Sequence, residues 1–389
     1  MLDYSKILSP TVQEMKPSGI RKFFDMIGSL DDVVALTVGQ PDFVTPWHIR
    51  DAAIESLEKG KTYYTSNSGT IELRQEISSY MNRRFGVSYS PEDEIIVTVG
   101  GSEAIDLTVR ALVSPGDEVI IPQPAFVCYG PIVSLAGGVP VYINTKEENR
   151  FKLTAAELRA AITPKTKLLV LPFPNNPTGA IMTKEDLEEI AAVLRGTDIM
   201  VLSDEIYCEL TYGRDHVTIA SLDGMHERTI IASGFSKTYA MTGWRLGYTL
   251  APKEITKQML KIHQYAIMCA PTASQFAAVE AMHNGDADVE MMRSEYNRRR
   301  RYIVGGLKSI GLDCFDPEGA FYVFPNISGF GMDSEKFCER LLYENGVAIV
   351  PGTAFGECGE GFARISYAYS VEHIAKALDR IENFVKKLK

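Results

Sequence analysis

The stretch TIIASGFSKTYAMTGWRLGYTLA, residues 229–251, contains two short apolar runs separated by small and hydroxyl residues. Lys237 lies between the two runs, and Arg245 opens the second run eight residues later. A single lysine is most often a solvated surface charge. The role of Lys237 therefore has to be judged from the fold that the other apolar runs of the chain predict.

Seven short apolar runs alternate with helix-like stretches between about residues 94 and 251. Several are apolar on consecutive residues, which is typical of strands covered on both faces. The runs are EIIVTV, EVIIP, VPVYI, KLLVLPF, IMVLSD, TIIAS and RLGYTLA. This pattern predicts a doubly wound, mainly parallel α/β sheet. Ligands of such sheets bind beyond the carboxyl ends of the strands.

A second, smaller unit follows the predicted sheet. Long helices are expected after Pro252, and then an α+β unit with strands near residues 320–324, 347–350 and 363–366 and a closing helix from residue 371. We predict three parts: an N-terminal arm (1–42) that packs with the small domain, a large domain (43–285) and a small C-terminal domain (286–389).

The composition argues against several classes of protein. The net charge is −10, so a general attraction to nucleic acid or to an anionic membrane is not expected. The basic run Arg298–Arg301 is interpreted as a solvated helical face, because successive residues fan around a helix at about 100° each. The scattered cysteines and histidines indicate free thiols and no metal site. With no apolar h-region and no apolar run of about 20 residues, we expect a cytoplasmic protein.

Chemically distinctive residues follow the predicted strands. After EIIVTV, Gly100 and Gly101 permit a tight turn into a helix that begins near Ser102, and a helix N-terminus suits a phosphate. The Glu103 side chain should point away from such an anion. Many turns of this kind bind nothing, so this motif alone is weak.

Three further strands add polar groups to the same edge. The loop PNNPTGA offers Asn175 and Asn176, Asp204 ends the run IMVLSD with Tyr207 after it, and Lys237 follows TIIAS. Each has an ordinary structural explanation by itself, such as a rigid turn or a paired acid. Together they suit a phosphorylated aromatic cofactor that Lys237 holds as a Schiff base.

The chain resembles the pyridoxal-phosphate-dependent class I/II aminotransferases of fold type I, in particular the aspartate and aromatic aminotransferase group. It is also similar to the bacterial N-acetyl-diaminopimelate aminotransferases. The resemblance runs nearly end to end, through LTVGQPDFVTP, YYTSNSGTIELR, VGGSEAI, SPGDEVIIPQPAFVCY, PNNPTGAI, SDEIYCEL, GFSKTYAMTGWRLGY, GAFYVFP and GEGFARISYA.

The resemblance implies roles for individual residues around pyridoxal 5′-phosphate. Lys237 would form the Schiff base and move the proton during catalysis, Asp204 would keep the pyridine nitrogen protonated, and Tyr207 and Asn176 would bind the phenolic oxygen. Phe126 would stack on the ring. The phosphate would be held by the backbone of Gly101, Ser102 and Glu103, together with Ser236 and Arg245.

The resemblance also implies the substrate and partner contacts. Arg364 would grip the substrate α-carboxylate in a bidentate pair, with the Gly39 amide and Asn176 assisting. Tyr64 would reach the phosphate of a neighbouring subunit, which implies a homodimer with shared active sites. Some relatives have a hydroxyl residue where this chain has Gly234, so the Ser236 contact is less certain.

The expected reaction is transfer of an amino group from an aromatic or aspartate-like L-amino acid to a 2-oxo acid such as 2-oxoglutarate. The alternatives are an N-acetyl-diaminopimelate aminotransferase and a C–S β-lyase, although lyase-like relatives tend to have histidine in place of Tyr207. An effector domain of a transcription regulator is a third possibility. Tyr322, in GAFYVFP, either borders the pocket or, as is more common for an aromatic residue of a strand, lies in the core, so it is left out of the predicted site. Arg21 is interpreted more as a surface charge than as a substrate contact.

Overall fold

The computed structural model describes residues 2–17, 19–20, 26, 28, 30 and 32–388. Its central feature is a seven-stranded sheet with the strand order β2-β8-β7-β6-β5-β3-β4. Strand β8 is antiparallel to both of its neighbours and the other pairs are parallel. The strands are β2 (Ile95–Thr98), β3 (Glu118–Gln123), β4 (Val139–Asn144), β5 (Thr166–Leu171), β6 (Met200–Asp204), β7 (Thr229–Gly234) and β8 (Gly247–Leu250). All seven predicted strands and the doubly wound, mainly parallel sheet are confirmed.

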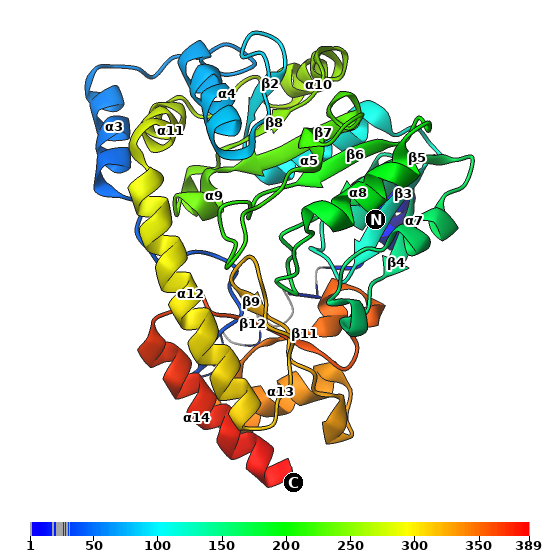
Figure 1. Ribbon diagram of the computed structural model, residues 1–389, viewed down its shortest axis with the longest axis vertical. Coiled ribbons are helices and arrows are strands. Elements are labelled where there is room, and N and C mark those ends of the chain that lie inside the picture. Colours follow the sequence, from blue (N-terminus) through cyan, green and yellow to red (C-terminus); the bar gives the residue numbers. More distant parts are fainter. Residues whose placement is uncertain are drawn as a thin grey trace.

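Helices cover both faces of this sheet (Figure 1). Alternate residues of one strand enter different cores: Ile95 of β2 packs in the cluster that holds Leu73, whereas Ile96 packs with Leu107. This explains why the strands are apolar on consecutive residues. The helices of this half are α3 (Trp47–Glu58), α4 (Ile71–Phe85), α5 (Gly101–Leu112), α6 (Tyr129–Leu135), α7 (Ala155–Ala161), α8 (Lys184–Leu194), α9 (Phe235–Thr238), α10 (Lys253–Ala266) and α11 (Thr272–Asn284).

A long helix, α12 (Asp286–Ser309), runs from the large sheet to a smaller unit at the other end of the molecule (Figure 1). That unit contains α13 (Ser334–Asn345), α14 (Val371–Leu388) and an antiparallel sheet of order β11-β12-β9. Its strands are β9 (Tyr322–Val323), β11 (Val350–Pro351) and β12 (Ala363–Ser366). A parallel pair joins β1 (Val34–Ala35) to β10 (Val347–Ala348). The strand expected over residues 347–350 is therefore two short strands that pair with different partners.

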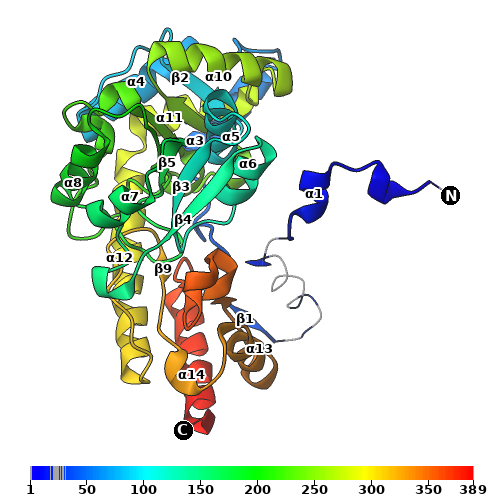
Figure 2. The ribbon, with the colours of Figure 1, turned by 90° about the vertical axis from the view of Figure 1, so that its right-hand side faces the viewer.

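Two further features concern the edges of the fold. Residues 2–17, with α1 (Pro10–Glu14), project from the body of the molecule (Figure 2). The interpretation of Arg298–Arg301 as a wholly solvated face is wrong for Arg299, which is 5% exposed and whose Nη1 lies 2.7 Å from Asp42 Oδ1. No helix within the described part of the chain combines the length and the apolar character needed to cross a membrane.

Candidate active site

A cavity of about 260 Å³ lies at the carboxyl ends of the large-sheet strands, where the small unit meets them. We call it the strand-end cavity. It is lined by eleven of the residues expected from the sequence: Gly39, Gly101, Ser102, Phe126, Asn176, Asp204, Tyr207, Ser236, Lys237, Arg245 and Arg364. Two expected residues, Tyr64 and Glu103, are not among the lining residues. Arg21 lies outside the described residues.

Lys237 enters the cavity from α9, the single helical turn that follows β7. Its Nζ donates a hydrogen bond to the Gly39 carbonyl oxygen at 2.6 Å. Burial, and then repulsion from Arg245 and Arg364, lowers the pKa of Lys237 from 10.5 to about 8. A partly desolvated amine of this kind is present as a free nucleophile in an appreciable fraction near neutral pH.

Asp204 ends β6 and is buried beside Lys237. Its Oδ2 accepts a hydrogen bond from the Tyr129 hydroxyl at 2.6 Å, and its Oδ1 accepts one from the Ile206 amide at 3.2 Å. Burial raises the pKa of Asp204, while these two hydrogen bonds and the charge of Lys237 oppose that rise. The carboxylate is therefore positioned to stabilise a cationic partner in the cavity.

The turn before Lys237 explains why the chain has Gly234 rather than a hydroxyl residue. A Cβ at this position would lie 2.9 Å from Gly247 Cα and 3.0 Å from the Leu246 carbonyl oxygen. The backbone is extended there, so the restriction comes from the close approach of β8 and not from the dihedral angles. Ser236 is the hydroxyl residue of this segment that lines the cavity.

The phosphate end of the expected site forms where β2 turns into α5. Gly100 has φ +78°, and a Cβ there would lie 2.6 Å from Arg245 Nη2. Arg245 is itself held at φ +52°, an unusual conformation for a side-chain-bearing residue that points to a functional constraint. The Gly101 and Ser102 amides begin α5, where helix geometry leaves N–H groups without an intrahelical acceptor.

Glu103 turns its side chain away from this end, as expected. Its Oε1 lies 2.6 Å from His263 Nδ1, and its carboxylate also accepts a hydrogen bond from the Val99 amide. Its own amide donates to the Gly100 carbonyl at 3.2 Å. These contacts hold the turn on the side away from the cavity. The side that faces the cavity presents backbone amides and Arg245.

Arg364 reaches the cavity from β12, in the small unit. Its Nη1 donates to Asn176 Oδ1 at 2.9 Å and its Nη2 to the Thr37 carbonyl at 2.5 Å. The guanidinium carbon lies 4.6 and 4.7 Å from the centroids of the Tyr322 and Phe355 rings. Within the described part of the chain, the buried Nε of Arg364 meets no acceptor. Such a held, incompletely satisfied guanidinium suits a carboxylate ligand.

Sequence reasoning missed Tyr129, and it left Tyr322 out of the site in favour of a place in the core, where Tyr322 is indeed buried. Both line the strand-end cavity, and the Tyr322 hydroxyl lies 2.8 Å from that of Tyr207. Tyr129 stands three residues after Phe126 and begins α6, the helix that follows β3, so the rule that located Asp204 and Lys237 also covered it. The sequence pointed only weakly to a pocket role for Tyr322, since strand aromatics are more often core residues.

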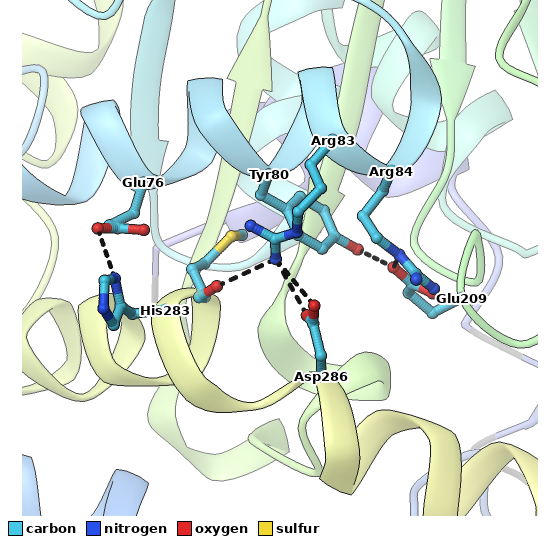
Figure 3. A network of polar contacts seen from close by, with 8 residues as sticks. Glu76, Tyr80, Arg83, Arg84, Glu209, His283 and Asp286 are labelled. Atoms are coloured by element: carbon cyan, nitrogen blue, oxygen red, sulfur yellow. Dashed lines mark hydrogen bonds and ion pairs between the residues drawn. The ribbon is translucent and has the colours of Figure 1, made fainter.

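A polar network supports the segment that carries Tyr207 (Figure 3). Glu209, two residues later, is 3% exposed, and its Oε1 accepts hydrogen bonds from the Tyr80 hydroxyl at 2.5 Å and from Arg84 Nε at 2.9 Å. Nearby, Arg83 of α4 pairs with Asp286 at the start of α12 at 3.1 Å. The network thus ties the loop after β6 and the start of α12 to helix α4.

Comparisons with known proteins bear on this arrangement. The family model described as aminotransferase class I and II matches residues 31–381. The chain is 54% identical over 380 residues to the putative aminotransferase YugH of Bacillus subtilis, with 98% of each chain covered. It is 48% identical over 381 residues to the probable N-acetyl-LL-diaminopimelate aminotransferase of the same organism, with 98% of this chain and 96% of the relative covered. This chain belongs to the class I and II aminotransferases.

A solved structure agrees with this assignment. The aromatic aminotransferase from Pyrococcus horikoshii superposes on the chain with a TM-score of 0.90 at 45% identity, covering 95% of this chain and 100% of that one. The protein is thus a fold-type I enzyme that depends on pyridoxal 5′-phosphate.

The residues of this aminotransferase fit that cofactor. A Cβ at Gly247 would lie 2.6 Å from the Gly100 carbonyl carbon and 2.7 Å from the Gly101 nitrogen, so the turn at the phosphate end closes only around glycine. Asp204 offers a carboxylate for the pyridine nitrogen of the cofactor ring, and Lys237 offers an amine for the aldehyde of the same ring. When bound, the cofactor supplies an electron sink for negative charge at the substrate Cα.

Proposed function

We propose that the enzyme moves the amino group of an aromatic or aspartate-like L-amino acid to 2-oxoglutarate, with Lys237 as the covalent anchor of the cofactor. The observation that carries the proposal is the pairing, in one cavity, of a low-pKa lysine with a buried arginine whose Nε lacks an acceptor. Lys237 provides the base for proton transfer at Cα, and Arg364 holds the α-carboxylate so that this proton faces the lysine.

The remaining residues have supporting roles in this proposal. Asp204 keeps the pyridine nitrogen protonated, Tyr207 and Asn176 donate to the phenolic oxygen, and Phe126 covers the ring. Gly39 contributes its amide to the carboxylate. The phosphate is bound by the backbone at the start of α5, from Gly101 to Glu103, and by Ser236 and Arg245.

The walls of the cavity favour aromatic donors. Apolar side chains from three segments, Ile20, Ile105 and Ile206, border it beside the Phe126 ring. Among the described lining residues, the cations are Lys237, Arg245 and Arg364, and each already has a role in this proposal. A donor with a large apolar side chain is therefore better served than one with a second carboxylate, although apolar pockets discriminate only modestly between related side chains.

A homodimer with shared active sites is part of the same proposal. Tyr64 is 75% exposed and does not line the cavity of its own chain, and Arg245 is exposed at the phosphate end. Two further exposed aromatics, Tyr63 and Tyr265, lie on this half of the molecule. A second copy of the chain that covers these side chains would place its Tyr64 at the phosphate.

A panel of amino donors tests the proposed specificity. We expect kcat/KM with 2-oxoglutarate to be highest for phenylalanine and tyrosine, with aspartate, alanine and N-acetyl-diaminopimelate as the competing donors. If both aromatic donors fall roughly 100-fold or more below another donor, a gap of about 2.7 kcal/mol, the aromatic assignment is wrong. The relative named as an N-acetyl-LL-diaminopimelate aminotransferase makes that donor the second candidate.

The β-lyase alternative predicts a different product. An aminotransferase converts its cofactor stoichiometrically to the amine form when an amino acid is added without a 2-oxo acid. A lyase given a cysteine conjugate instead releases pyruvate and ammonia repeatedly. Absorbance of the cofactor and an ammonia assay on the same sample therefore separate the two reactions.

A further inference from the structure

Tyr322 joins two parts of the strand-end cavity that come from different sheets. It lies on β9 of the small unit, is 1% exposed, and places its hydroxyl 2.8 Å from the hydroxyl of Tyr207. Tyr207 follows β6 of the large sheet and is also buried. A hydrogen bond between two buried hydroxyls fixes the O–H direction of the donor and the position of the acceptor oxygen.

The ring of Tyr322 contacts the carboxylate-binding group. Arg364 lies on the adjacent strand β12, and its guanidinium carbon is 4.6 Å from the centroid of the Tyr322 ring. The same guanidinium carbon is 4.7 Å from the centroid of the Phe355 ring. The two rings add to the hydrogen bonds that Arg364 donates to Asn176 and to the Thr37 carbonyl, and together these contacts keep the buried cation in place.

Gly39 provides the space for the Tyr322 hydroxyl. A Cβ at Gly39 would lie 2.1 Å from that oxygen, so no other residue fits there without displacing it. The carbonyl of Gly39 accepts the hydrogen bond from Lys237 Nζ. Tyr322 therefore contacts three parts of the cavity. These are Gly39, whose carbonyl contacts Lys237, the hydroxyl of Tyr207, and the guanidinium of Arg364, which is expected to bind substrate.

Charged groups around the two hydroxyls affect the pKa of both tyrosines. Burial raises the pKa of both, and the charge of Arg364 opposes that rise at each of them. Their hydrogen bond lowers the pKa of Tyr322 and raises that of Tyr207, which is the pattern of a Tyr207 donor and a Tyr322 acceptor, but either hydroxyl can take either role. If Tyr207 donates to the phenolic oxygen of the cofactor, the Tyr322 hydroxyl would turn to donate to Tyr207.

We propose that Tyr322 is a positioning residue for transamination: its hydroxyl directs Tyr207 toward the phenolic oxygen of the cofactor, and its ring holds Arg364 for the substrate carboxylate. This inference rests on the function proposed above.

Two substitutions separate the role of the Tyr322 hydroxyl from the role of its ring. Tyr322→Phe removes the hydroxyl and keeps the ring, whereas Tyr322→Leu removes both. Tyr367→Phe is the matched control, because that buried hydroxyl donates to the Ala320 carbonyl at 3.1 Å and does not line the cavity.

The first readout is the pH dependence of the absorbance of the bound cofactor. Tyr207 and the Lys237 nitrogen would share the phenolic oxygen, so a weaker Tyr207 donor leaves the lysine nitrogen with the stronger hydrogen bond. We expect Tyr322→Phe to raise the pH midpoint by about half a unit, the size of one neutral hydrogen bond. The charged groups around Lys237 are Asp204, Arg245 and Arg364, and the substitution removes none of them.

The second readout is the affinity of the holoenzyme for 3-phenylpropanoate, a carboxylate without an amino group. Tyr322→Phe should bind it within about twofold of the wild type, and Tyr322→Leu should bind it roughly tenfold more weakly, since an unsupported guanidinium loses its fixed orientation. Tyr367→Phe should match the wild type in both readouts. The affinity of Tyr322→Leu is interpreted only if its thermal unfolding midpoint shows that the variant is folded. Tyr322→Phe is the milder change.

An unchanged pH midpoint in Tyr322→Phe, or unchanged 3-phenylpropanoate affinity in folded Tyr322→Leu, would overturn the proposal. Failure of the underlying function looks different. In that case the wild-type protein itself would show no cofactor conversion with any amino donor, whatever residue stands at position 322.

Discussion

Lys237 and Asp204 are charged side chains that burial disfavours, and each is compensated in a different way. The lysine loses part of its basicity, with a pKa of about 8, and its Nζ finds one backbone acceptor at Gly39. The Asp204 carboxylate accepts two hydrogen bonds, one from the Tyr129 hydroxyl and one from the Ile206 amide. Titratable groups perturbed in this way and gathered in one cavity are the usual mark of an active site.

The lowered pKa of Lys237 predicts how the apoenzyme takes up its cofactor. Only the neutral amine attacks an aldehyde, so the rate constant for attachment should rise about tenfold per pH unit below pH 8 and level off above it. Absorbance after mixing apoenzyme with pyridoxal 5′-phosphate between pH 6 and 10 measures it. A rate that keeps rising past pH 9.5 would mean that the lysine has its ordinary pKa near 10.5.

Removal of the Asp204 charge should affect catalysis much more than cofactor attachment. We expect Asp204→Asn to lower kcat by at least about 100-fold while the cofactor stays bound covalently, because the pyridine nitrogen loses its anionic partner. Steady-state kinetics and the cofactor spectrum measure the two effects. Full activity with an unchanged spectrum would show that Asp204 is only a structural acid.

The neighbouring carboxylate serves as the control. Glu205 is 1% exposed but binds Ser203, Thr218 and His216 behind the strand and does not line the cavity. Glu205→Gln should reduce thermal stability and leave kcat of the folded enzyme within a few fold. A loss of kcat in Glu205→Gln as large as in Asp204→Asn would show that general disturbance of β6, rather than the charge at 204, explains the result.

The residues at strand ends were predictable, and those whose role depends on long-range packing were not. Lys237, Asp204 and the glycines of the phosphate turn follow buried strands, so the topology alone brings them together. Tyr322 comes from a different sheet, and only the tertiary structure shows that its hydroxyl meets Tyr207. The burial of Arg299 was not predictable, because its ion pair with Asp42 joins residues 257 positions apart in the sequence.

At the scale of single elements, the turn from β2 into α5 is the most constrained part of the site. Gly100 combines a positive φ with a potential Cβ contact of 2.6 Å to Arg245. The strands themselves were predicted well, since fully buried runs leave a clear apolar signal. The short strands near residue 349 were not separated, because a two-residue strand carries no periodicity of its own.

Gly100→Ala should weaken cofactor affinity at least about tenfold, because the new methyl group displaces Arg245 from the phosphate end. Gly60→Ala is the matched control: Gly60 has φ +68° and no atom within 4 Å of the added Cβ. Both variants should lose about 1 kcal/mol of stability, but only the first should lose cofactor affinity. Equal cofactor affinity in the two variants would contradict the assignment of this turn as the phosphate site.

At the scale of the whole molecule, the long helix α12 connects two units whose meeting surface contains the cavity (Figure 1). The domain boundaries at residues 42 and 285 stay predictions, as does the packing of the N-terminal arm against the small domain. Residues 2–17 project from the body and the exposed Tyr64 lies outside its own cavity, and both features fit an assembly of two chains (Figure 2).

Mixing two defective variants tests whether active sites are shared between subunits. Tyr64→Ala and Lys237→Ala homodimers should each be impaired, one in affinity for the cofactor phosphate and the other in chemistry. After subunit exchange, each mixed dimer would contain one intact site, so activity should recover toward about one quarter of the wild type. No recovery, although mixed dimers form by mass spectrometry, would show that Tyr64 acts within its own chain or not at all.

The most direct test of the central claim is to locate the lysine that binds the cofactor. Holoenzyme is reduced with borohydride, digested, and its peptides are examined by mass spectrometry for the reduced pyridoxyl group. We predict a single labelled site at Lys237 in the segment 233–245, no label in Lys237→Ala, and a folded Lys237→Ala protein without turnover. Label on a different lysine, or near-normal turnover in Lys237→Ala, would contradict the account.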